Sequence, residues 1–484
     1  MSLKKNTLYN LLGATAPLVI IIATTPLYLK AIGNERYGIL ALVWLLFGYF
    51  GLFDFGLSRA TSNRLSIASN QAPSRQQELF TTSLILNTGL GVVAGMIILL
   101  IGLPLLENLS KISAPLNTEL ARAVPWIAGL LPISTMGSAV TGALESRERF
   151  LALNIAQFFG SLHLAVAPLL AVLWIEPSIE IAVAATAISR AIGVFPIAIL
   201  AWRQYEMRQP LIFRKETIKD LFAYGGWITA TNVISPLLVS IDQFLIAGIK
   251  GAAALPYYSI PFSLASKMLI LPNAAARALF PKISRQDSIE AKASLIGYCE
   301  TIGLLMSLIC GPSLLVSHYV LLLWIDSAFA DNASMVLRII VLGAWLNGIA
   351  SIPYIYLQGQ RRPEVPAKIH AAEIIPYIFL LWGMVAWLGL VGAALAWAIR
   401  VAVDAALLLH FSGVLKNVVT RLFPLAVLQS TAFALSITHH NFSTLLAGTV
   451  LLVGVTAGYG YLCIPLVKET VNQFISNLII KRNL

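Results

Sequence analysis

The sequence predicts an all-α, polytopic membrane protein with about fourteen transmembrane helices. Of its 484 residues, 58% are hydrophobic and only 11% are charged, and the mean hydropathy is +0.81. Soluble domains carry roughly 25% charged residues, so this chain cannot cover a water-facing surface. Its apolar residues gather in runs of about 20, which is the length that crosses a bilayer as a helix.

Taken in order, these runs predict spans at about 8–30, 37–57, 80–104, 123–144, 150–174, 179–202, 224–248, 254–280, 293–317, 334–358, 367–388, 390–411, 418–437 and 443–467. The first span contains Pro17, and the turn AIGNERYG separates it from a second span that runs into Asp54. The longest connections, at about 58–79, 105–122 and 203–223, are too short for a soluble domain. We therefore expect a chain made almost entirely of spans.

The distribution of Lys and Arg predicts that both termini lie in the cytoplasm. In that orientation 22 of the 33 basic residues fall in cytoplasmic segments, as the positive-inside rule requires. The outward loops hold Lys30, Arg36, Lys111, Arg122 and Lys250. The spans themselves hold Arg59, Arg190, Lys267, Arg277, Arg338 and Arg400. The net charge of +11 is therefore mostly an orientation signal, and it does not indicate binding of nucleic acid.

A weak internal repeat divides the chain into halves. Pro17 in the first span and Pro236 in the seventh lie 219 residues apart, and a similar turn from Gly to Tyr follows each span. Two such repeats, with cargo bound between them, are a frequent transporter architecture. We expect an N-terminal lobe over 1–210, a C-terminal lobe over 211–412, and a two-span extension with an interfacial helix over 413–484.

The opening residues carry a resemblance to a known family. They read NTLYNLLGATAPLVIIIATTPLYLKAIGNERYGILALVWLLFGYFGLFDFGLSRA, with a Pro-containing first span, a turn at Gly33–Gly38 and the exit FDFGLSRA. Gly359, Arg361 and Arg362 form a similar inward turn after the tenth span. In these parts the chain resembles the Wzx-type oligosaccharide flippases of the multidrug/oligosaccharidyl-lipid/polysaccharide exporter superfamily.

That resemblance implies a fold and an activity. Two six-helix lobes would surround a central cavity, and alternating access would move undecaprenyl-diphosphate-linked oligosaccharide repeat units, such as those of O-antigen, across the bacterial inner membrane. The protein would be a flippase without ATP hydrolysis rather than an enzyme. Its partners would be the lipid-linked oligosaccharide and, in addition, a polysaccharide polymerase and a chain-length regulator.

Isolated cations within the spans are the candidates for cargo binding. Arg190 and Lys267 lie near the middle of their spans, and neither has an acid one helical turn away. Lipid does not solvate such a charge, so it must face protein or water, and a diphosphate would bind it. Arg59, at the inward mouth, and Arg400 are further candidates, although Asp404 at i+4 could neutralise Arg400. For each cation, an ion pair without a role in cargo binding is the alternative.

Two in-span acids are candidates for coupling transport to an ion. Asp242 and Glu300 also lack a partner one turn away, so they could bind H⁺ or Na⁺ or could pair with the in-span cations. Asp54 lies near the inward end of the second span. We regard it, together with Pro17 and Pro236, as a structural or gating candidate.

The remaining polar groups have simpler interpretations. His370 and Glu373 are expected at the wet inward end of the eleventh span, and Arg338 near an outward end, where its side chain can snorkel. The cysteines are expected to be small buried residues without a disulfide or a metal; they are Cys299, Cys310 and Cys463. The sequence has no P-loop and no metal-binding motif, so an ion gradient or the membrane potential would supply the energy.

Two other functions fit the same composition. A cation-coupled drug exporter of the same superfamily would favour acidic cavity residues, and the spans here are rich in Arg and Lys. A membrane glycosyltransferase or polymerase acting on the same lipid would need a large outward loop with catalytic residues. The outward loops of this chain are short.

Overall fold

The structure is a computed structural model. It describes residues 3–49, 56–110, 112–205, 217–218, 240–438, 441–469 and 472–473. Within those ranges every regular element is a helix, which confirms the predicted all-α fold class. The chain divides into two compact units, Met1–Pro256 and Tyr257–Leu484, and we describe each unit by itself. The lobes and extension bounded at residues 210 and 412 remain a prediction.

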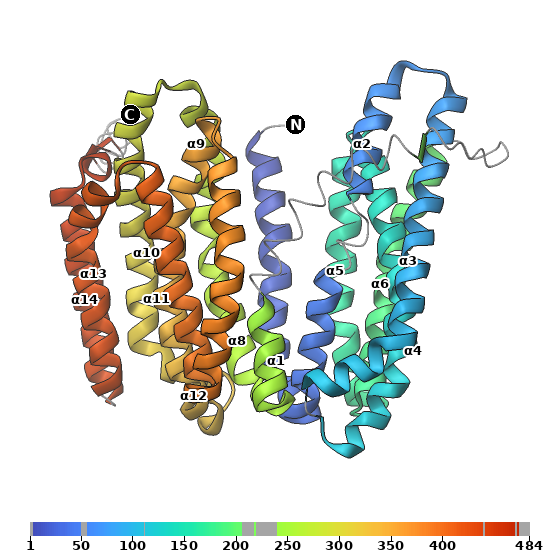
Figure 1. Cartoon of the computed structure of the whole chain (residues 1–484), viewed down its shortest axis with the longest axis horizontal. Coiled ribbons are helices and arrows are strands. Elements are labelled where there is room, and N and C mark those ends of the chain that lie inside the picture. The colour runs from blue at the N-terminus through green and yellow to red at the C-terminus, as the bar shows by residue number, and fades with distance from the viewer. Residues whose placement is uncertain are drawn as a thin grey trace, which may run out of the picture. The chain divides into compact units, whose positions relative to one another are not determined.

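Long helices that run up and down form the first unit (Figure 1). They are α1 (Leu3–Tyr49), α2 (Leu57–Ile67), α3 (Pro73–Ser110), α4 (Ala114–Glu145), α5 (Phe150–Trp174) and α6 (Ile179–Gln204), followed by a helical segment at 240–250 and the 3₁₀ turn η3 (Ala252–Ala254). The central helix is α4, which packs against α2, α3, α5 and α6. Helices thus coincide with the first six predicted spans, and α1 contains the first span and most of the second.

A break at Gly33 separates the two predicted spans within α1. Gly33 has φ 75° and ψ 170°, a conformation that residues with a Cβ rarely adopt. The rings of Tyr28, Tyr37 and Trp44 pack edge to face beside this break, with centroids 5.4–6.3 Å apart. A Cβ on Gly38 would lie 1.9 Å from a main-chain oxygen of η3. The Gly33–Gly38 turn is therefore a sharp bend fixed by aromatic packing and by close approach to η3.

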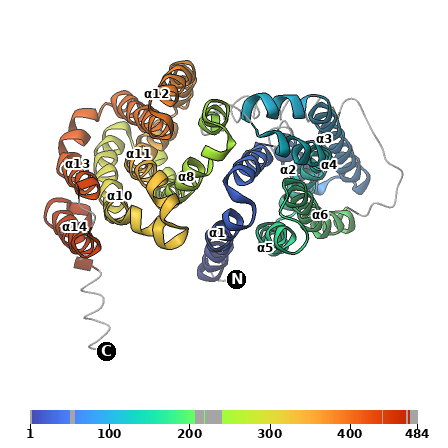
Figure 2. The ribbon, with the colours of Figure 1, turned by 90° about the horizontal axis from the view of Figure 1, so that it is seen from below.

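The second unit contains seven described helices. They are α8 (Pro256–Met268), α9 (Ile270–Arg285), α10 (Ser288–Trp324), α11 (Ser327–Gly359), α12 (Glu364–Phe411), α13 (Leu415–Thr438) and α14 (Phe442–Cys463). Figure 2 views them nearly end-on, with α13 and α14 beside α10, against which both pack. A break at Gly389, with φ 63° and ψ −136°, interrupts α12. This break confirms the predicted boundary between the eleventh and twelfth spans.

The surface of the described helices is apolar. Trp387 is 85% exposed, Leu323 82% and Leu100 77%, and exposed apolar groups of this size are unfavourable in water. Nine of the described helices are long and apolar enough to cross a membrane. Length and surface composition therefore agree on a multi-pass membrane protein.

Candidate functional site

Three of the four predicted cargo-binding cations have no ionic partner among the residues that the structure describes. Arg59 lies in the first turn of α2, Arg190 near the middle of α6, and Lys267 in the last turn of α8. All three side chains are exposed. Within the described ranges none of them takes part in an ion pair or a hydrogen bond, and a role in cargo binding stays a prediction.

The fourth cation, Arg400, is paired, but not with the residue that helical spacing predicted. Its Nε lies 3.0 Å from Oε2 of Glu373, and both side chains are nearly buried, at 12% and 8% exposed. Asp404 instead lies near His370, whose Nε2 is 3.3 Å from Oδ1 of that carboxylate. The expected Arg400–Asp404 pair is therefore wrong.

The break in α12 explains the change of partner. Glu373 lies sixteen residues before Gly389, and Asp404 lies fifteen residues after it. A helix that folds back at this break brings those positions to the same level, so Arg400 meets a carboxylate of the preceding span. His370 and Glu373 consequently pack against the second half of α12. The expectation that these two side chains are exposed to water at the inward end of the eleventh span is therefore wrong.

Together these four residues form what we call the α12 cluster: His370, Glu373, Arg400 and Asp404. The ring of Tyr354 in α11 stacks on His370 with the centroids 5.8 Å apart. The Oε1 atom of Glu373 is buried without a hydrogen-bond partner in the described part of the chain. The cluster thus contains two carboxyl groups, one beside the Arg400 guanidinium and one beside the His370 imidazole.

The predicted ion-coupling acids are both buried. Glu300 accepts a hydrogen bond from Nη1 of Arg421 at 3.0 Å, and its side chain is 7% exposed against 53% for Arg421. Its partner thus comes from α13 rather than from an in-span cation. Asp242 is fully buried, and its Oδ1 accepts a hydrogen bond from the backbone N–H of Gln243 at 2.8 Å. Whether either acid binds an ion stays a prediction.

The other predicted residues have mixed outcomes. Asp54 and Pro236 lie outside the described residues, and Pro17 lies in α1 but its side chain is not described. Arg338 is only 8% exposed, and its Nε donates to Oγ of Ser317 at 3.0 Å. The expectation that Arg338 snorkels to a surface is therefore wrong, because a serine of α10 lies within its reach. Of the cysteines, Cys299 and Cys310 are buried as expected, whereas Cys463 is exposed.

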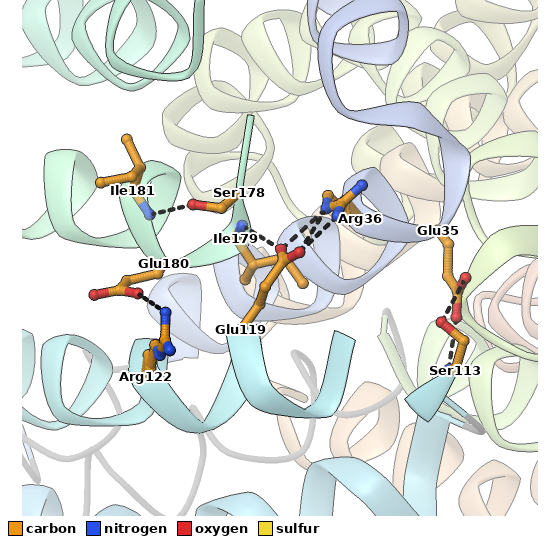
Figure 3. Close-up of polar contacts among 9 residues, drawn as sticks. All are labelled: Glu35, Arg36, Ser113, Glu119, Arg122, Ser178, Ile179, Glu180 and Ile181. Carbon is orange, nitrogen blue, oxygen red and sulfur yellow. Dashed lines mark hydrogen bonds and ion pairs between the residues drawn. The ribbon is translucent and has the colours of Figure 1, made fainter. Parts of the chain in front are cut away.

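A polar cluster that sequence reasoning missed joins three elements at one end of the first unit (Figure 3). Glu119 of α4 accepts hydrogen bonds from Nε and Nη2 of Arg36, the shortest at 2.6 Å. It also accepts from the backbone N–H of Ile179 at 3.0 Å, which satisfies a free amide in the first turn of α6. Glu35 accepts from the backbone N–H and the hydroxyl of Ser113, at 2.8 and 3.1 Å.

We call this group the outer cluster, because the sequence predicts the outward side for it; its members are Glu35, Arg36, Ser113, Glu119 and Ile179. It ties the bend in α1 to the beginnings of α4 and α6. Its basic member was counted in the sequence only as one cation of an outward loop. The signal that could have indicated the cluster is the acid that each of these outward connections carries. Nothing in the sequence, however, specifies which acid meets which cation.

A second cluster, at the opposite ends of the same helices, joins α3 to the end of α4. Arg75 donates from Nη1 to Glu78 at 2.5 Å and to Thr217 at 3.1 Å. Arg147 donates to the side chain of Gln76, and its guanidinium lies 5.4 Å from the ring centre of Tyr205. These inner contacts and the outer cluster hold the first unit together at both ends.

Sequence comparison relates this chain to known proteins. The profile of a family described as polysaccharide biosynthesis protein matches residues 3–286. A protein of Shigella flexneri named "Putative O-antigen transporter" is 32% identical over 413 residues, which are 84% of this chain and 97% of that protein. The "Uncharacterized membrane protein EpsK" of Bacillus subtilis (strain 168) is 24% identical over 405 residues, which are 79% and 77% of the two chains.

Structural comparison gives the same fold. The lipid II flippase MurJ in an inward closed conformation superposes with a TM-score of 0.76 over 94% of this chain and 99% of that one, at 13% identity. An inward-facing multidrug resistance transporter of the MATE family, in the MOP superfamily, gives a TM-score of 0.64 over 87% and 99% of the two chains, at 14% identity. At these identities the likeness establishes the fold alone.

Proposed function

We propose that this chain, which belongs to the polysaccharide biosynthesis protein family and is a multi-pass membrane transporter, flips lipid-linked oligosaccharides across the bacterial inner membrane. The proposed cargo is undecaprenyl diphosphate carrying the repeat unit of O-antigen or of a related polysaccharide. It would move from the cytoplasmic to the periplasmic leaflet, with both termini of the protein in the cytoplasm. The printed name of the Shigella flexneri relative and the resemblance of the opening residues support this cargo class.

The observation that carries the proposal is the contrast between paired and unpaired cations. Arg36 and Arg400 each lie within 3.0 Å of a carboxylate oxygen, whereas Arg59, Arg190 and Lys267 have no acid partner within the described ranges. A guanidinium and an ammonium group are both suited to phosphate oxygens. A diphosphate head that reaches any one of these side chains would supply the negative charge that it lacks.

Alternating access is the mechanism that we propose for this movement. The outer cluster and the inner contacts tie the helices of the first unit at both ends, which favours movement of that unit as one body. Helix pairs that are hydrogen-bonded at both ends resist separation, so the opening of a pathway would come from a shift of whole units. In the second unit the α12 cluster links the first half of α12 to its second half.

The energy for flipping would come from the membrane potential or from a coupled ion. An inside-negative potential favours outward movement of an anionic head by about 2.3 kcal/mol per charge per 100 mV. For a coupled H⁺ or Na⁺, the buried acids Asp242 and Glu300 are our sequence-based candidates. The α12 cluster is a third place where a proton could bind, because it has more acids than fixed cations.

Reconstitution tests the proposal directly. Purified protein in vesicles, loaded with a fluorescent undecaprenyl-diphosphate-linked sugar in one leaflet, should transfer that lipid to the other leaflet. The variants Arg190→Ala and Lys267→Ala should reduce the transfer rate about tenfold or more, since each loses a charge-assisted contact. Arg203→Ala is the matched control, because Arg203 is an exposed arginine of the same helix, α6, near its end. Transfer that is unaffected in both variants would remove these residues from the cargo site.

Export in cells gives a second readout. Surface polysaccharide should be lost in a strain that lacks the gene and should return with the wild-type chain but not with Arg190→Ala. A chain that exports only small cationic drugs, and leaves surface polysaccharide unchanged, would overturn the proposed cargo. A polysaccharide polymerase and a chain-length regulator are the proposed partners, which co-purification from the membrane would test.

A further inference from the structure

A long apolar groove lies between α5 and α6 in the first unit. Its volume is about 910 Å³, and it is lined along α5 from Ala152 to Leu170 and along α6 from Ile192 to Leu200. At 1.5 Å per residue the α5 side is about 27 Å long and the α6 wall covers about 12 Å of it; the α5 side is close to the roughly 30 Å thickness of the hydrocarbon core of a bilayer. A groove of this length suits an extended chain better than a compact molecule.

The groove follows from the way the two helices cross. A Cβ on Gly160 of α5 would lie 3.2 Å from Cα of Gly193 in α6, and a Cβ on Gly193 would lie 3.3 Å from Cα of Gly160. Small residues let two helix backbones approach this closely in a membrane. The larger residues that flank the crossing, such as Phe159 and Pro196, then form the walls. The groove is therefore built from rigid helices and involves no loop.

An ionisable side chain lies a little more than halfway along the α5 side of the groove. Among its lining residues His163 is the one that can ionise, and its Nδ1 is buried without a hydrogen-bond partner in the described structure. Because α5 and α6 run antiparallel through the Gly160–Gly193 crossing, the residue three positions after Gly160 lies level with the residue three positions before Gly193. Those residues are His163 and Arg190. Arg190 does not itself line the groove: its position lies level with His163 along the helix pair, two residues before Ile192, where the α6 wall begins.

From this arrangement we infer that the α5–α6 groove holds the hydrocarbon chain of an anionic lipid whose phosphate-bearing head passes Arg190 and His163. Charge complementarity selects this occupant. A lipid without net charge would fill the apolar walls but would leave Arg190 without a counterion near the middle of its helix. The inference rests on the proposed function in taking this lipid to be the transported polyprenyl diphosphate.

The site has a mechanical consequence for flipping. A polyprenyl chain in the groove stays beside the protein and within the thickness of the bilayer while its head crosses. Arg190 would meet the diphosphate at the midpoint of that crossing, where the cost of an uncompensated charge is highest. The imidazole N–H of His163 would add a donor to the phosphate oxygens.

Photo-crosslinking tests the groove without requiring transport. The full chain is placed in phosphatidylcholine vesicles with one of three photoreactive probes: a polyprenyl diphosphate, a polyprenol of the same chain length, or phosphatidylcholine itself. The diphosphate probe should label residues of α5 and α6 in the groove. Ala167→Phe, which fills the groove, should reduce that labelling about tenfold. Leu173→Phe, an exposed position on the same helix outside the groove, should leave it unchanged.

Variants of Arg190, compared between the diphosphate and the polyprenol probes, test the role of its charge. Arg190→Ala should weaken labelling by the diphosphate probe about tenfold, because a charge-assisted contact is lost, and should not alter labelling by the polyprenol. Arg190→Lys should retain most of the labelling. Equal labelling by all three probes, independent of Ala167→Phe and Arg190→Ala, would show that the groove holds bulk bilayer lipid only, and the inference would be wrong.

Flipping measured in the same vesicles separates this inference from the proposed function. Probe-specific labelling without any flipping would overturn the proposed function and leave the lipid site standing. Normal flipping, together with labelling that neither Ala167→Phe nor Arg190→Ala changes, would overturn the lipid site and leave the proposed function standing.

Discussion

The buried pair between Arg400 and Glu373 makes a quantitative prediction about stability. The two charged atoms are 3.0 Å apart, and both side chains are almost inaccessible. Their gross attraction is about 5 kcal/mol at an effective dielectric constant of about 20, and desolvation offsets most of it. The replacement Arg400→Met removes the attraction but leaves the carboxylate of Glu373 buried beside Asp404. A buried charge that has lost its partner destabilises a protein by about 3–5 kcal/mol.

Thermal unfolding in detergent measures this effect. A chain of 484 residues has an unfolding entropy of about 1 kcal/mol/K, so Arg400→Met should lower Tm by about 3–5 °C. Glu373→Gln combined with Arg400→Met removes both charges and should recover at least half of that loss. The same change at an exposed arginine, Arg203→Met, is the control and should move Tm by less than about 0.5 °C.

Two outcomes would refute this account of the α12 cluster. A Tm for Arg400→Met within about 1 °C of wild type would mean that the carboxylate is already solvated or protonated, so the guanidinium contributes little. A double variant less stable than Arg400→Met alone would mean that Glu373 makes its important contact elsewhere. Either result would also weaken the cluster as a place for a coupled proton.

Other positions give predictions that the same unfolding assay can check. Gly38→Ala should destabilise the chain by about 3 kcal/mol, since the added Cβ would overlap a main-chain oxygen of η3. Gly89→Ala is the control, because its Cβ would enter open space beside α3, and it should leave stability unchanged. An equal loss of stability in the two variants would contradict the contact between Gly38 and η3. Glu119→Gln should destabilise by about 1 kcal/mol through weaker bonds to Arg36. Glu180→Gln, whose acid lies 4.0 Å from its exposed partner, should change stability by less than about 0.5 kcal/mol, and a larger effect than that of Glu119→Gln would refute the ranking.

The course of the helices could be predicted from the sequence because the bilayer fixes their length. A span needs about 20 apolar residues, and the breaks at Gly33 and Gly389 fall where two such runs meet. Glycine at both breaks adopts a positive φ, which a residue with a side chain would resist. Composition and the length of the apolar runs were therefore sufficient for the positions of these turns and for the first six spans. The predicted seventh span, 224–248, lies mostly outside the described residues, and the predicted eighth span, 254–280, divides into α8 and α9.

The partners of the charges could not be predicted from spacing along one helix. The rule of i and i+4 favours Asp404 for Arg400, but the fold at Gly389 presents Glu373, a residue 27 positions away. Arg36 and Glu119 are 83 positions apart, and Arg338 meets the hydroxyl of Ser317, which no charge rule would select. Each of these contacts depends on the packing of two helices, which a single sequence does not specify.

The proposed function rests on the distinction between paired and unpaired cations. Insertion of one Arg or Lys at the centre of a membrane helix is unfavourable by about 2.5–3.5 kcal/mol. At the central depth that the sequence predicts for them, Arg190 and Lys267 together would destabilise the inserted chain by about 5–7 kcal/mol. No ion pair within the described residues offsets that energy, whereas Glu373 does offset the charge of Arg400. A bound diphosphate would supply the missing negative charge and would restore the balance only while cargo is present. Cargo should therefore stabilise the wild-type protein against heat and should stabilise Arg190→Ala much less, a difference that a purely structural cation would not produce.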